Sequence, residues 1–408
     1  MTPAAQVDVA IVGAGPAGST LAAALARRGL DVAVLEQAPA WRWRAGGVFT
    51  SPAAVTALER AGLDRDTLSG VARPIAAMRL ETPDGTRVRL TYGADRGGQP
   101  AVGLDRSRLD PALEELARRA GATLRRGAGV DDVRLAGDAS TILRVGDEEI
   151  KARVVVGADG AHSIVARAVG VERPVRLPRR IGLTWHVADP RTPARDGTPI
   201  DARMVVIDDG YVGLAPVPGK RLNIGIVLGP SWHESVARDG AHETVRRALR
   251  MVPPTDDDPV AWSDATMCDR IAGAWPLGTR VTRRAGPGWF LVGDAAGFLD
   301  PFTGEGLHRA LISTELAAPA IHALVTGRAS ATAAAAAYDR VMRRRFAGKD
   351  AVSWLVQSFL ARPWLFGYAA RRLAERPDVR ATMGLVMGDL VPASRGLDPR
   401  FIAALLAP

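Results

Sequence analysis

The sequence predicts an α/β protein in which a Rossmann-like domain is interleaved with a domain built on an antiparallel sheet and followed by a helical C-terminal region. Three observations predict this fold class. A buried strand, a glycine turn and a helix follow one another at the start of the chain. Residues 181–228 show short strand patterns, and from Gly306 onward the pattern is helical. At roughly 100–200 residues per domain, the 408 residues allow about two to four such units.

The order of these patterns predicts that the domains are discontinuous in sequence. The parallel segments of the Rossmann-like domain would lie at 1–75, 105–175 and 281–330. The segments of the sheet domain would lie at 76–104, which resembles a hairpin with a turn at Pro83-Asp84-Gly85, and at 176–280, which includes a long helix over 231–251. The C-terminal helical region covers 331–408.

Composition excludes several classes of protein. Hydrophobic residues make up 47% of the chain and charged residues 24%, as is typical of globular proteins. The single cysteine, Cys268, excludes an intrachain disulfide, and no Cys/His cluster indicates a metal site. The sequence shows no signal-peptide pattern and no apolar stretch of the roughly 18–20 residues that a membrane span needs. We therefore expect a cytoplasmic protein without a transmembrane segment.

The net charge of +9 does not indicate a nucleic-acid-binding protein. The arginines are spread among acidic residues along the chain, and aromatic residues are only 5% of it, so no basic stripe with stacking aromatics is formed. The positive balance suits small anionic ligands. A local group of arginines, Arg371, Arg372, Arg376 and Arg380, is interpreted as a solvated helix face, with a docking surface for a carrier protein or a membrane as the alternative.

The first chemical motif is the glycine turn Gly13-x-Gly15-x-x-Gly18, which lies between a strand over 7–12 and a helix over 19–28. Gly13 permits the tight turn, Gly15 allows the backbone to approach a pyrophosphate, and Gly18 allows the helix to pack on the strand. The next strand ends at Glu36, 18 residues after Gly18. A carboxylate there accepts hydrogen bonds from ribose hydroxyls and repels a 2′-phosphate, which predicts FAD or NAD as the ligand.

Two further segments place a carboxylate just beyond a buried strand. Asp159 follows the strand over 154–156, and Asp294 follows the strand over 290–292. A carboxylate at the C-terminal edge of a parallel sheet can accept hydrogen bonds from a ribose or a polyol. After Asp294, the run Pro301–Gly306 opens a helix near Leu307, and its backbone N–H groups can stabilise negative charge on a flavin ring.

These three segments, in this order, resemble the flavin-dependent aromatic-hydroxylase superfamily, which shares the fold of para-hydroxybenzoate hydroxylase. The superfamily includes class A flavoprotein monooxygenases, flavin-dependent halogenases and geranylgeranyl reductases. The resemblance covers about residues 5–330 and implies FAD as the cofactor, an FAD-binding Rossmann-like domain and a substrate-binding sheet domain.

The resemblance also implies roles for individual residues. Contacts to the FAD pyrophosphate would come from Gly13, Gly15 and Gly18, with Ala17 in the same turn. Contacts to the rest of the cofactor would come from Glu36 at the adenosine ribose, Val130 at the adenine, Arg106 near the phosphates, Asp294 at the ribitol, and Gly304, Gly306 and Leu307 at the flavin ring. Asp159 would lie in the motif that the family associates with both FAD and NAD(P)H.

Within the superfamily, the geranylgeranyl reductase branch is the most similar. Gly210-Tyr211 followed by Pro216, and Asn223-Ile224-Gly225, match the strands of its substrate domain. Two residues differ from that branch: Ala45 stands where its reductases often carry a cysteine, and Gly213 stands where they carry a tryptophan. The halogenase segment Trp-x-Trp-x-Ile-Pro is not matched, because Trp41-Arg42-Trp43-Arg44 lies elsewhere and lacks Ile-Pro.

The resemblance therefore implies an FAD-dependent monooxygenase that hydroxylates or epoxidises a hydrophobic, ring-containing small molecule through a flavin C4a-hydroperoxide. Molecular oxygen would be the co-substrate, and electrons would come from NAD(P)H docking transiently or from reduced flavin supplied by a partner reductase. The alternatives are a reductase of an isoprenoid double bond and a flavin-binding protein that shields an intermediate. No catalytic acid or base is identified. Trp185 and His186 alternate on one strand, so one should face a core and the other the substrate, and His308 opens the helix near the flavin.

Overall fold

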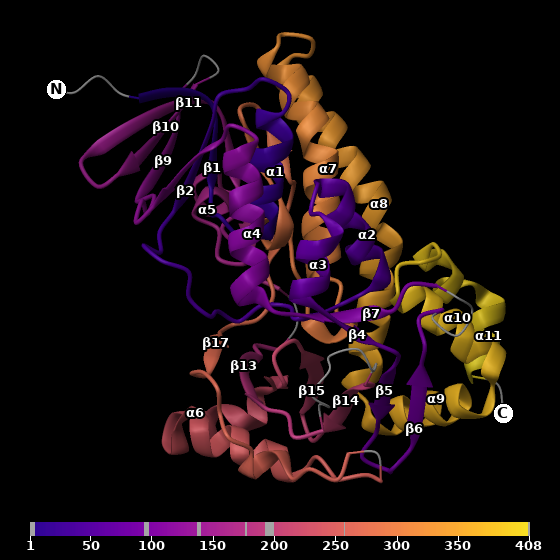
Figure 1. The fold of residues 1–408 in the computed structure, drawn as a ribbon. Coiled ribbons are helices and arrows are strands. Elements are labelled where there is room, and N and C mark those ends of the chain that lie inside the picture. Colours follow the sequence, from indigo (N-terminus) through magenta and orange to yellow (C-terminus); the bar gives the residue numbers. More distant parts are fainter. Residues whose placement is uncertain are drawn as a thin grey trace.

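The structure, a computed structural model, describes residues 5–93, 98–136, 140–175, 178–191, 200–256 and 258–406. A mainly parallel sheet lies above a mostly antiparallel sheet in Figure 1, and the C-terminal helices flank the second sheet. The predicted fold class is therefore confirmed. The boundaries proposed between the domains stay a prediction.

The first sheet has eight strands in the described part of the chain, in the order β19-β20-β11-β1-β2-β8, and β10 and β9 extend it from β11. Their bounds are β1 (Ala5–Val12), β2 (Val32–Glu36), β8 (Thr123–Arg126), β9 (Asp132–Ala136), β10 (Ser140–Val145), β11 (Glu148–Gly157), β19 (Ala285–Gly286) and β20 (Trp289–Leu291). β1 is parallel to both β2 and β11. The chain passes from β1 to one side of the sheet and later returns to the other side. In doubly wound folds, ligands bind where the strand order reverses in this way; here that place is the C-terminal end of β1, which we call the crevice.

Helices pack along the faces of the first sheet. α1 lies between α4 and α7, and α8 lies along α7 (Figure 1). The bounds of the helices in this half of the molecule are α1 (Pro16–Ala26), α2 (Pro52–Ala61), α3 (Arg65–Val71), α4 (Arg106–Arg119), α5 (Ile164–Ala168), α7 (Gly306–Val325) and α8 (Ala331–Leu360). All five residues of β2 are buried, as expected for a strand covered on both faces.

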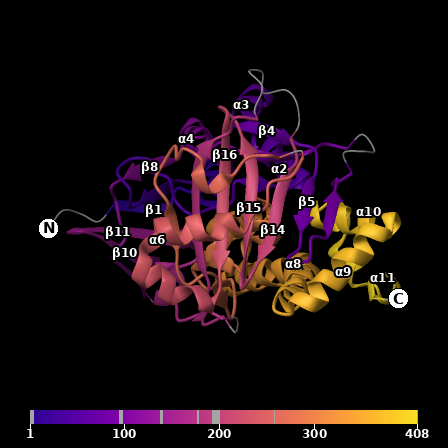
Figure 2. The same ribbon diagram turned by 90° about the horizontal axis from the view of Figure 1, so that it is seen from below.

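The second sheet has the order β17-β13-β16-β15-β14-β5-β6. Its strands are β5 (Met78–Glu81), β6 (Arg87–Leu90), β13 (Ile181–Ala188), β14 (Ala202–Ile207), β15 (Gly210–Val217), β16 (Arg221–Leu228) and β17 (Ala272–Ala274). α6 (His233–Arg250) covers one face of this sheet (Figure 2). The opposite face packs against the C-terminal helices α9 (Pro363–Glu375), α10 (Pro377–Met387) and α11 (Pro399–Leu406) and faces the first domain.

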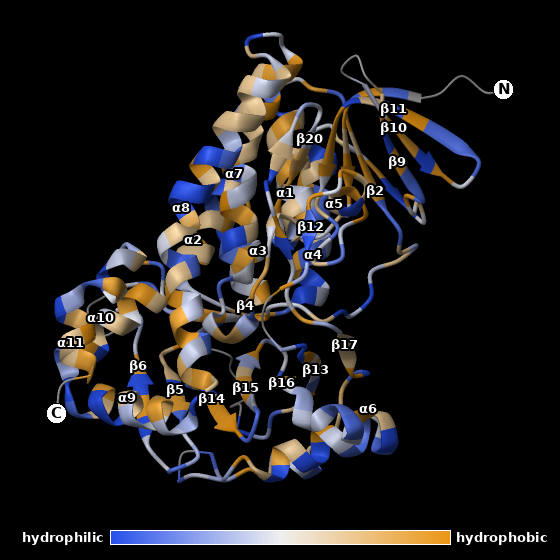
Figure 3. Ribbon diagram, turned by 180° about the vertical axis from the view of Figure 1, so that it is seen from behind, coloured by the Kyte–Doolittle hydropathy of each residue, from blue (hydrophilic) through white to orange (hydrophobic). Residues whose placement is uncertain are grey.

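Side chains of β13 alternate between these two faces. Leu183, Trp185 and Val187 belong to the hydrophobic core beneath α6. Because successive side chains of a strand point to opposite faces, Thr184 and His186 lie on the face turned toward the first domain. Figure 3 shows hydrophobic and hydrophilic residues mixed along α6 and α8, as expected of helices with one face against a core and the other toward solvent.

A small third sheet joins the two halves and differs from the prediction. Its strands are β3 (Phe49–Thr50), β4 (Ala72–Ile75) and β7 (Ala101–Leu104). The interval 76–104 was expected to be one hairpin; β5 and β6 do form a hairpin, but β7 pairs with β3 and β4. β7 also approaches β15 closely, because a Cβ at Gly103 would lie 1.9 Å from the carbonyl oxygen of Pro216. Beside the larger sheets, β12 (Glu172–Arg173) pairs with β18 (Arg280–Val281).

The long helix expected over 231–251 is interrupted. Gly240 has φ 77° and ψ 171°, which are not helical, so α6 consists of two shorter helical runs. Within the ranges that the structure describes, no helix combines the length and apolarity needed to cross a membrane. The four C-terminal arginines contact groups of the chain itself: Arg371 pairs with Asp84 and Arg372 with Glu375, while Arg376 and Arg380 donate to the carbonyl oxygens of Ala404 and Ala374.

Candidate cofactor and substrate site

The glycine turn after β1 has one position that fronts open space. A Cβ at Gly13, whose φ is +99°, would lie 2.6 Å from the carbonyl oxygen of Ala158, and a Cβ at Gly18 would lie 1.9 Å from that of Gly13. These two glycines are therefore required by packing. A Cβ at Gly15 would meet no atom within 4 Å. Gly15 lies at the N-terminus of α1, whose free N–H groups favour an anion, so the space beside it suits a pyrophosphate.

Glu36, at the end of β2, is a buried acceptor directly beside this turn. Its Oε2 accepts a hydrogen bond from the N–H of Ala14 at 3.0 Å, and its Oε1 accepts from the N–H of Ala38 at 3.0 Å and from Arg44 at 2.9 Å. Burial opposes ionisation, but these hydrogen bonds and the charge of Arg44 outweigh it and lower the pKa of the carboxyl group. The ionised group is suited to accept from ribose hydroxyls, which would compete with Arg44 for Oε1.

Asp294 presents a carboxylate that has no donor of its own. It lies in a short 3₁₀ helix, Gly293–Ala296, directly after β20. Burial raises the pKa of Asp294 to about 6, and the charges of Arg309 and Arg106 oppose this shift. Among the described residues, no side chain or backbone group donates a hydrogen bond to it. The residue is half-buried, so the hydroxyl groups of a polyol would reach this acceptor and satisfy it.

Arg106 lies close enough to Asp294 for their charges to interact. It begins α4, three residues before the helix start expected at Leu109, and donates to both carboxylate oxygens of Asp110 at 2.7 and 3.0 Å. It also donates to the carbonyl oxygen of Gly47 at 2.9 Å. The guanidinium group is thereby held near the crevice and links α4 to the segment that follows Glu36.

The N-terminus of α7 also reaches this crevice. Gly304 has φ +65° and packs so tightly against Phe49 that a Cβ would lie 2.7 Å from its ring. Gly306, the first residue of α7, would carry a Cβ with no atom within 4 Å, whereas the side chain of Leu307 is buried in the core. The open space beside Gly306 lets the first N–H groups of α7 face a ring that carries negative charge.

The remaining predicted residues lie around the same crevice. Asp159 accepts a hydrogen bond from the N–H of Ile164 at 2.7 Å through Oδ2, while its buried Oδ1 has no partner among the described residues. Burial raises the pKa of Asp159, and the hydrogen bond from Ser163, which lowers the pKa, only partly offsets this rise. Ala17 packs beneath Gly293. Val130 is half-buried beside Ala128, whose N–H donates to the carbonyl oxygen of Glu36 at 2.9 Å.

Two neighbouring glycines, Gly213 and Gly225, lie on the face of the second sheet that is turned toward the first domain, and we call them the glycine floor. Gly213 of β15 pairs with Gly225 of β16. A Cβ at Gly225 would meet nothing within 4 Å, and one at Gly213 would make ordinary contacts with the side chain of Met204, at 3.6 Å, and with the carbonyl oxygen of Gly225, at 3.7 Å. Beside this floor, the hydroxyl of Tyr211 donates to Asp300 at 2.6 Å. The tryptophan expected in the reductase branch is thus absent, and Gly213 carries no side chain on this face.

Polar residues lie at one end of the glycine floor, and the sequence indicated only one of them, His186, as a candidate. His186 was expected on one face or the other; its Nδ1 lies 2.6 Å from Asp269. The ring of Trp43 lies against that of His186, with centroids 4.5 Å apart. Asp269 and Trp43 are 83 and 143 residues away from His186 in sequence, so no local pattern could have indicated this cluster.

A buried charge cluster lies behind the start of α7. His308 Nδ1 lies 3.1 Å from Asp389, and Lys349 Nζ lies 2.9 Å from the other oxygen of Asp389 and 3.7 Å from Glu305. Burial works against ionisation of Asp389, but His308 and Lys349 lower its pKa to about 2. The sequence pointed to His308 alone, because its partners come from α8 and from the turn after α10.

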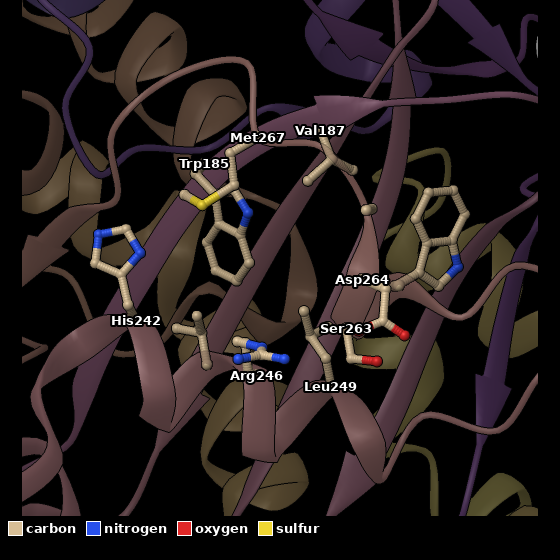
Figure 4. A pocket seen from close by; sticks show the side chains of 11 residues that line it. Trp185, Val187, His242, Arg246, Leu249, Ser263, Asp264 and Met267 are labelled. Atoms are coloured by element: carbon tan, nitrogen blue, oxygen red, sulfur yellow. The ribbon is translucent and has the colours of Figure 1, made fainter.

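The cavity shown in Figure 4 is not part of this crevice. It has a volume of about 340 Å³ and lies on the α6 side of the second sheet. His242 and Arg246 of α6 face Trp185 across it (Figure 4). Because Trp185 and His186 point to opposite faces, this cavity is separated from the glycine floor by the sheet itself.

Comparison with known proteins agrees with this geometry. Residues 6–351 match the family described as FAD binding domain, and the chain belongs to this family. It is 30% identical over 327 residues to digeranylgeranylglycerophospholipid reductase 2 of Methanopyrus kandleri, covering 78% of each chain. A flavoprotein/dehydrogenase of Cytophaga hutchinsonii has the same fold, with a TM-score of 0.80, 20% identity, and coverage of 96% of this chain and 95% of that one.

A second solved structure with this fold is that of pqsL, a probable FAD-dependent monooxygenase from Pseudomonas aeruginosa. Its TM-score is 0.70 at 22% identity, with 89% of this chain and 98% of that chain covered. The protein is therefore an FAD-dependent oxidoreductase, and the predictions of FAD and of an enzyme are confirmed. The roles of the individual site residues stay predictions.

Proposed function

We propose that the protein is an FAD-dependent monooxygenase that hydroxylates or epoxidises a hydrophobic, ring-containing small molecule. The observation that carries this proposal is the glycine floor of Gly213 and Gly225, which leaves room above the second sheet. An aromatic side chain at position 213 would occupy that room. Two glycines side by side on this face suit a flat ring better than they suit a single extended prenyl chain.

The residues of the crevice would hold FAD in the way that their geometry supports. Gly15 would face the pyrophosphate, Glu36 the adenosine ribose, and Asp294 the ribitol, while Gly306 would offer backbone N–H groups to the flavin ring. Bound FAD supplies two electrons, taken from NAD(P)H or from a partner reductase, that reduce O₂ so that one oxygen atom enters the substrate and the other leaves as water. The chain binds and orients both molecules and excludes water from them.

The experiment that tests this proposal compares products formed with and without oxygen. Purified holoenzyme receives NADPH or NADH, with and without a flavin reductase, and a panel of apolar ring compounds. A product that gains one oxygen atom, labelled from ¹⁸O₂ and absent under anaerobic conditions, is the expected result. A product that gains two hydrogens under strict anaerobiosis would overturn the proposal.

That second result would identify the other candidate, a reductase of an isoprenoid double bond. It is favoured by the similarity to the Methanopyrus kandleri protein, whose name describes it as a reductase of a digeranylgeranylglycerophospholipid. Prenylated lipids therefore belong in the same panel of compounds. Docking to a carrier protein or a membrane is not included in either candidate, because the C-terminal arginines already contact groups within the chain.

A further inference from the structure

His186 has the geometry of an oriented base at the polar end of the glycine floor. We propose that His186, held by Asp269, takes a proton from a hydroxyl group that the substrate carries on its apolar ring. This inference rests on the proposed function, since it concerns the substrate that lies above the second sheet. It adds the chemical class of that substrate: a phenol or an enol, rather than a pure hydrocarbon.

The register of the second sheet places His186 beside the floor. His186 of β13 pairs with Asn223 of β16. Thr184, two residues before His186, pairs with Gly225, two residues after Asn223. Gly225 in turn pairs with Gly213. A ring lying over the two glycines would therefore have Thr184, His186 and Asn223 at one end and the side chain of Met204 at the other.

The hydrogen bonds of His186 determine which ring nitrogen can act as a base. Asp269 accepts from the backbone N–H of His186 at 2.8 Å and lies 2.6 Å from Nδ1 through its other oxygen. An ionised carboxylate only accepts hydrogen bonds, so this contact assigns the proton to Nδ1 and leaves a lone pair on Nε2. Asn223 Nδ2 lies 3.5 Å from Nε2 and already donates to Thr184 Oγ1 and the carbonyl oxygen of Trp185.

Trp43 covers this group and connects it with the cofactor crevice. Its indole N–H donates to the carbonyl oxygen of Thr184 at 3.1 Å, and its ring lies against His186. The next residue, Arg44, pairs with Glu36, and Gly47 accepts from Arg106. One short segment thus spans from the residues proposed to hold FAD to the residues proposed to hold the substrate. Its position keeps bulk water away from the side chain of His186, which is 5% exposed.

The surrounding charges are suited to proton transfer. Asp269 contacts His186 directly, and Arg221, whose charge acts on the neighbouring Cys268, pairs with Asp105. When the substrate O–H bond breaks, the proton forms a new bond to Nε2, and the pair of electrons stays on the substrate oxygen. Asp269 then faces an imidazolium ion of opposite charge. The side chain of Asp269 is 27% exposed, so the proton has a route to solvent.

The test measures ionisation of a probe in the absence of turnover. Oxidised holoenzyme, without reductant, is titrated with 4-nitrophenol, whose anion has a distinct absorption, and difference spectra are recorded as a function of pH. We expect the bound probe to ionise at a pH about one unit or more below that of the free probe, a roughly tenfold larger ionised fraction. His186→Gln should abolish this shift, and Asp269→Asn should reduce it.

His242→Gln is the matched control, because this histidine of the same domain lies on the opposite face of the sheet and should not change the shift. FAD content and circular dichroism establish that each variant is folded. Failure of wild-type holoenzyme to bind 4-nitrophenol, or an equal shift in wild type and His186→Gln, would overturn the inference. The titration needs neither oxygen nor reductant, so its outcome is separate from the test of oxygen insertion.

Discussion

At the scale of single residues, the site is built from acceptors whose environments differ. Glu36 is buried but has two backbone donors and Arg44, so it stays ionised. Asp294 is half-buried and has no such donor among the described residues, and burial raises its pKa to about 6. Glu36 is thus ready for a ribose in the absence of cofactor, whereas Asp294 is satisfied only when a ligand supplies hydroxyl groups.

Because of this difference, we expect the free energy of unfolding of the cofactor-free protein to depend on pH. The pKa of Asp294 rises from 3.8 to about 6 on folding, so between these values the native state binds more protons than the unfolded state. Stability therefore falls as pH rises through this window, by up to about 3 kcal/mol at about 1.4 kcal/mol per pKa unit. Asp294→Asn removes this cost and should match wild type near pH 4 but exceed it above pH 6.

Urea unfolding of the two apoproteins across this range measures the effect. The same substitution should weaken FAD binding, because the amide offers one acceptor where the carboxylate offers two. A stability difference that is constant from pH 4 to pH 8, or unchanged affinity for FAD, would contradict the role of Asp294.

Residues in local motifs could be predicted from the sequence, and residues that meet through the fold could not. The glycine turn, Glu36 and Asp294 each follow a buried strand, and the topology of a parallel sheet brings strand ends together. Arg44 lies in a loop without periodicity, and its contact with Glu36 has no sequence signal. Asp269 reaches His186 only because the segment before β17 returns to lie along the end of β13, where the N–H of Cys268 donates to the carbonyl oxygen of His186.

At the scale of elements, the β1–α1 turn separates glycines needed for packing from a glycine needed for ligand approach. Gly18→Ala would place a methyl group 1.9 Å from the carbonyl oxygen of Gly13, so the turn must move and the apoprotein should be destabilised. Gly15→Ala meets no protein atom within 4 Å, and its φ is in the ordinary range, so the apoprotein should keep its melting temperature.

Gly18→Ala should therefore lower the stability of the apoprotein, whereas Gly15→Ala should weaken cofactor binding and leave that stability unchanged. We expect Gly15→Ala to raise the Kd for FAD about tenfold or more, because its methyl group would occupy the space beside the helix N-terminus. A loss of about 1.4 kcal/mol of binding free energy is enough for a tenfold change. Thermal unfolding of the apoproteins and fluorescence titration with FAD measure both effects. Wild-type affinity in Gly15→Ala would show that the pyrophosphate lies elsewhere.

The elements themselves were predictable where a periodic pattern was long enough. β1, α1, β13 and α7 follow clear apolar patterns and lie where the sequence indicated them. The third sheet was missed because β3 has two residues, too few to show alternation, and its pairing with β7 joins positions about fifty residues apart.

At the scale of the whole molecule, the buried charge cluster joins the C-terminal helices to the cofactor crevice. Lys349 of α8 pairs with Asp389 beyond α10 and lies near Glu305 at the start of α7, and it also donates to the carbonyl oxygen of Val386 at 2.9 Å. Phe302, just before α7, packs edge-on against Phe366 of α9. The C-terminal region is therefore expected to unfold together with the first domain rather than as a separate unit.

Lys349→Met tests this coupling. The substitution keeps an unbranched apolar stem but removes the charge, so Asp389 and Glu305 are left buried without their shared cation. Removal of one partner of a buried ion pair costs about 3–5 kcal/mol. If the cluster connects the two regions, the loss should appear as one cooperative transition at lower temperature, with release of FAD, followed by flavin fluorescence, coinciding with the loss of helix followed by circular dichroism. Lys151→Met, at an exposed position of β11, is the matched control and should leave both signals near their wild-type midpoints. If helix is lost while FAD stays bound, the two transitions are separate. That result would show that the C-terminal helices unfold independently of the crevice and that the cluster stabilises only these helices.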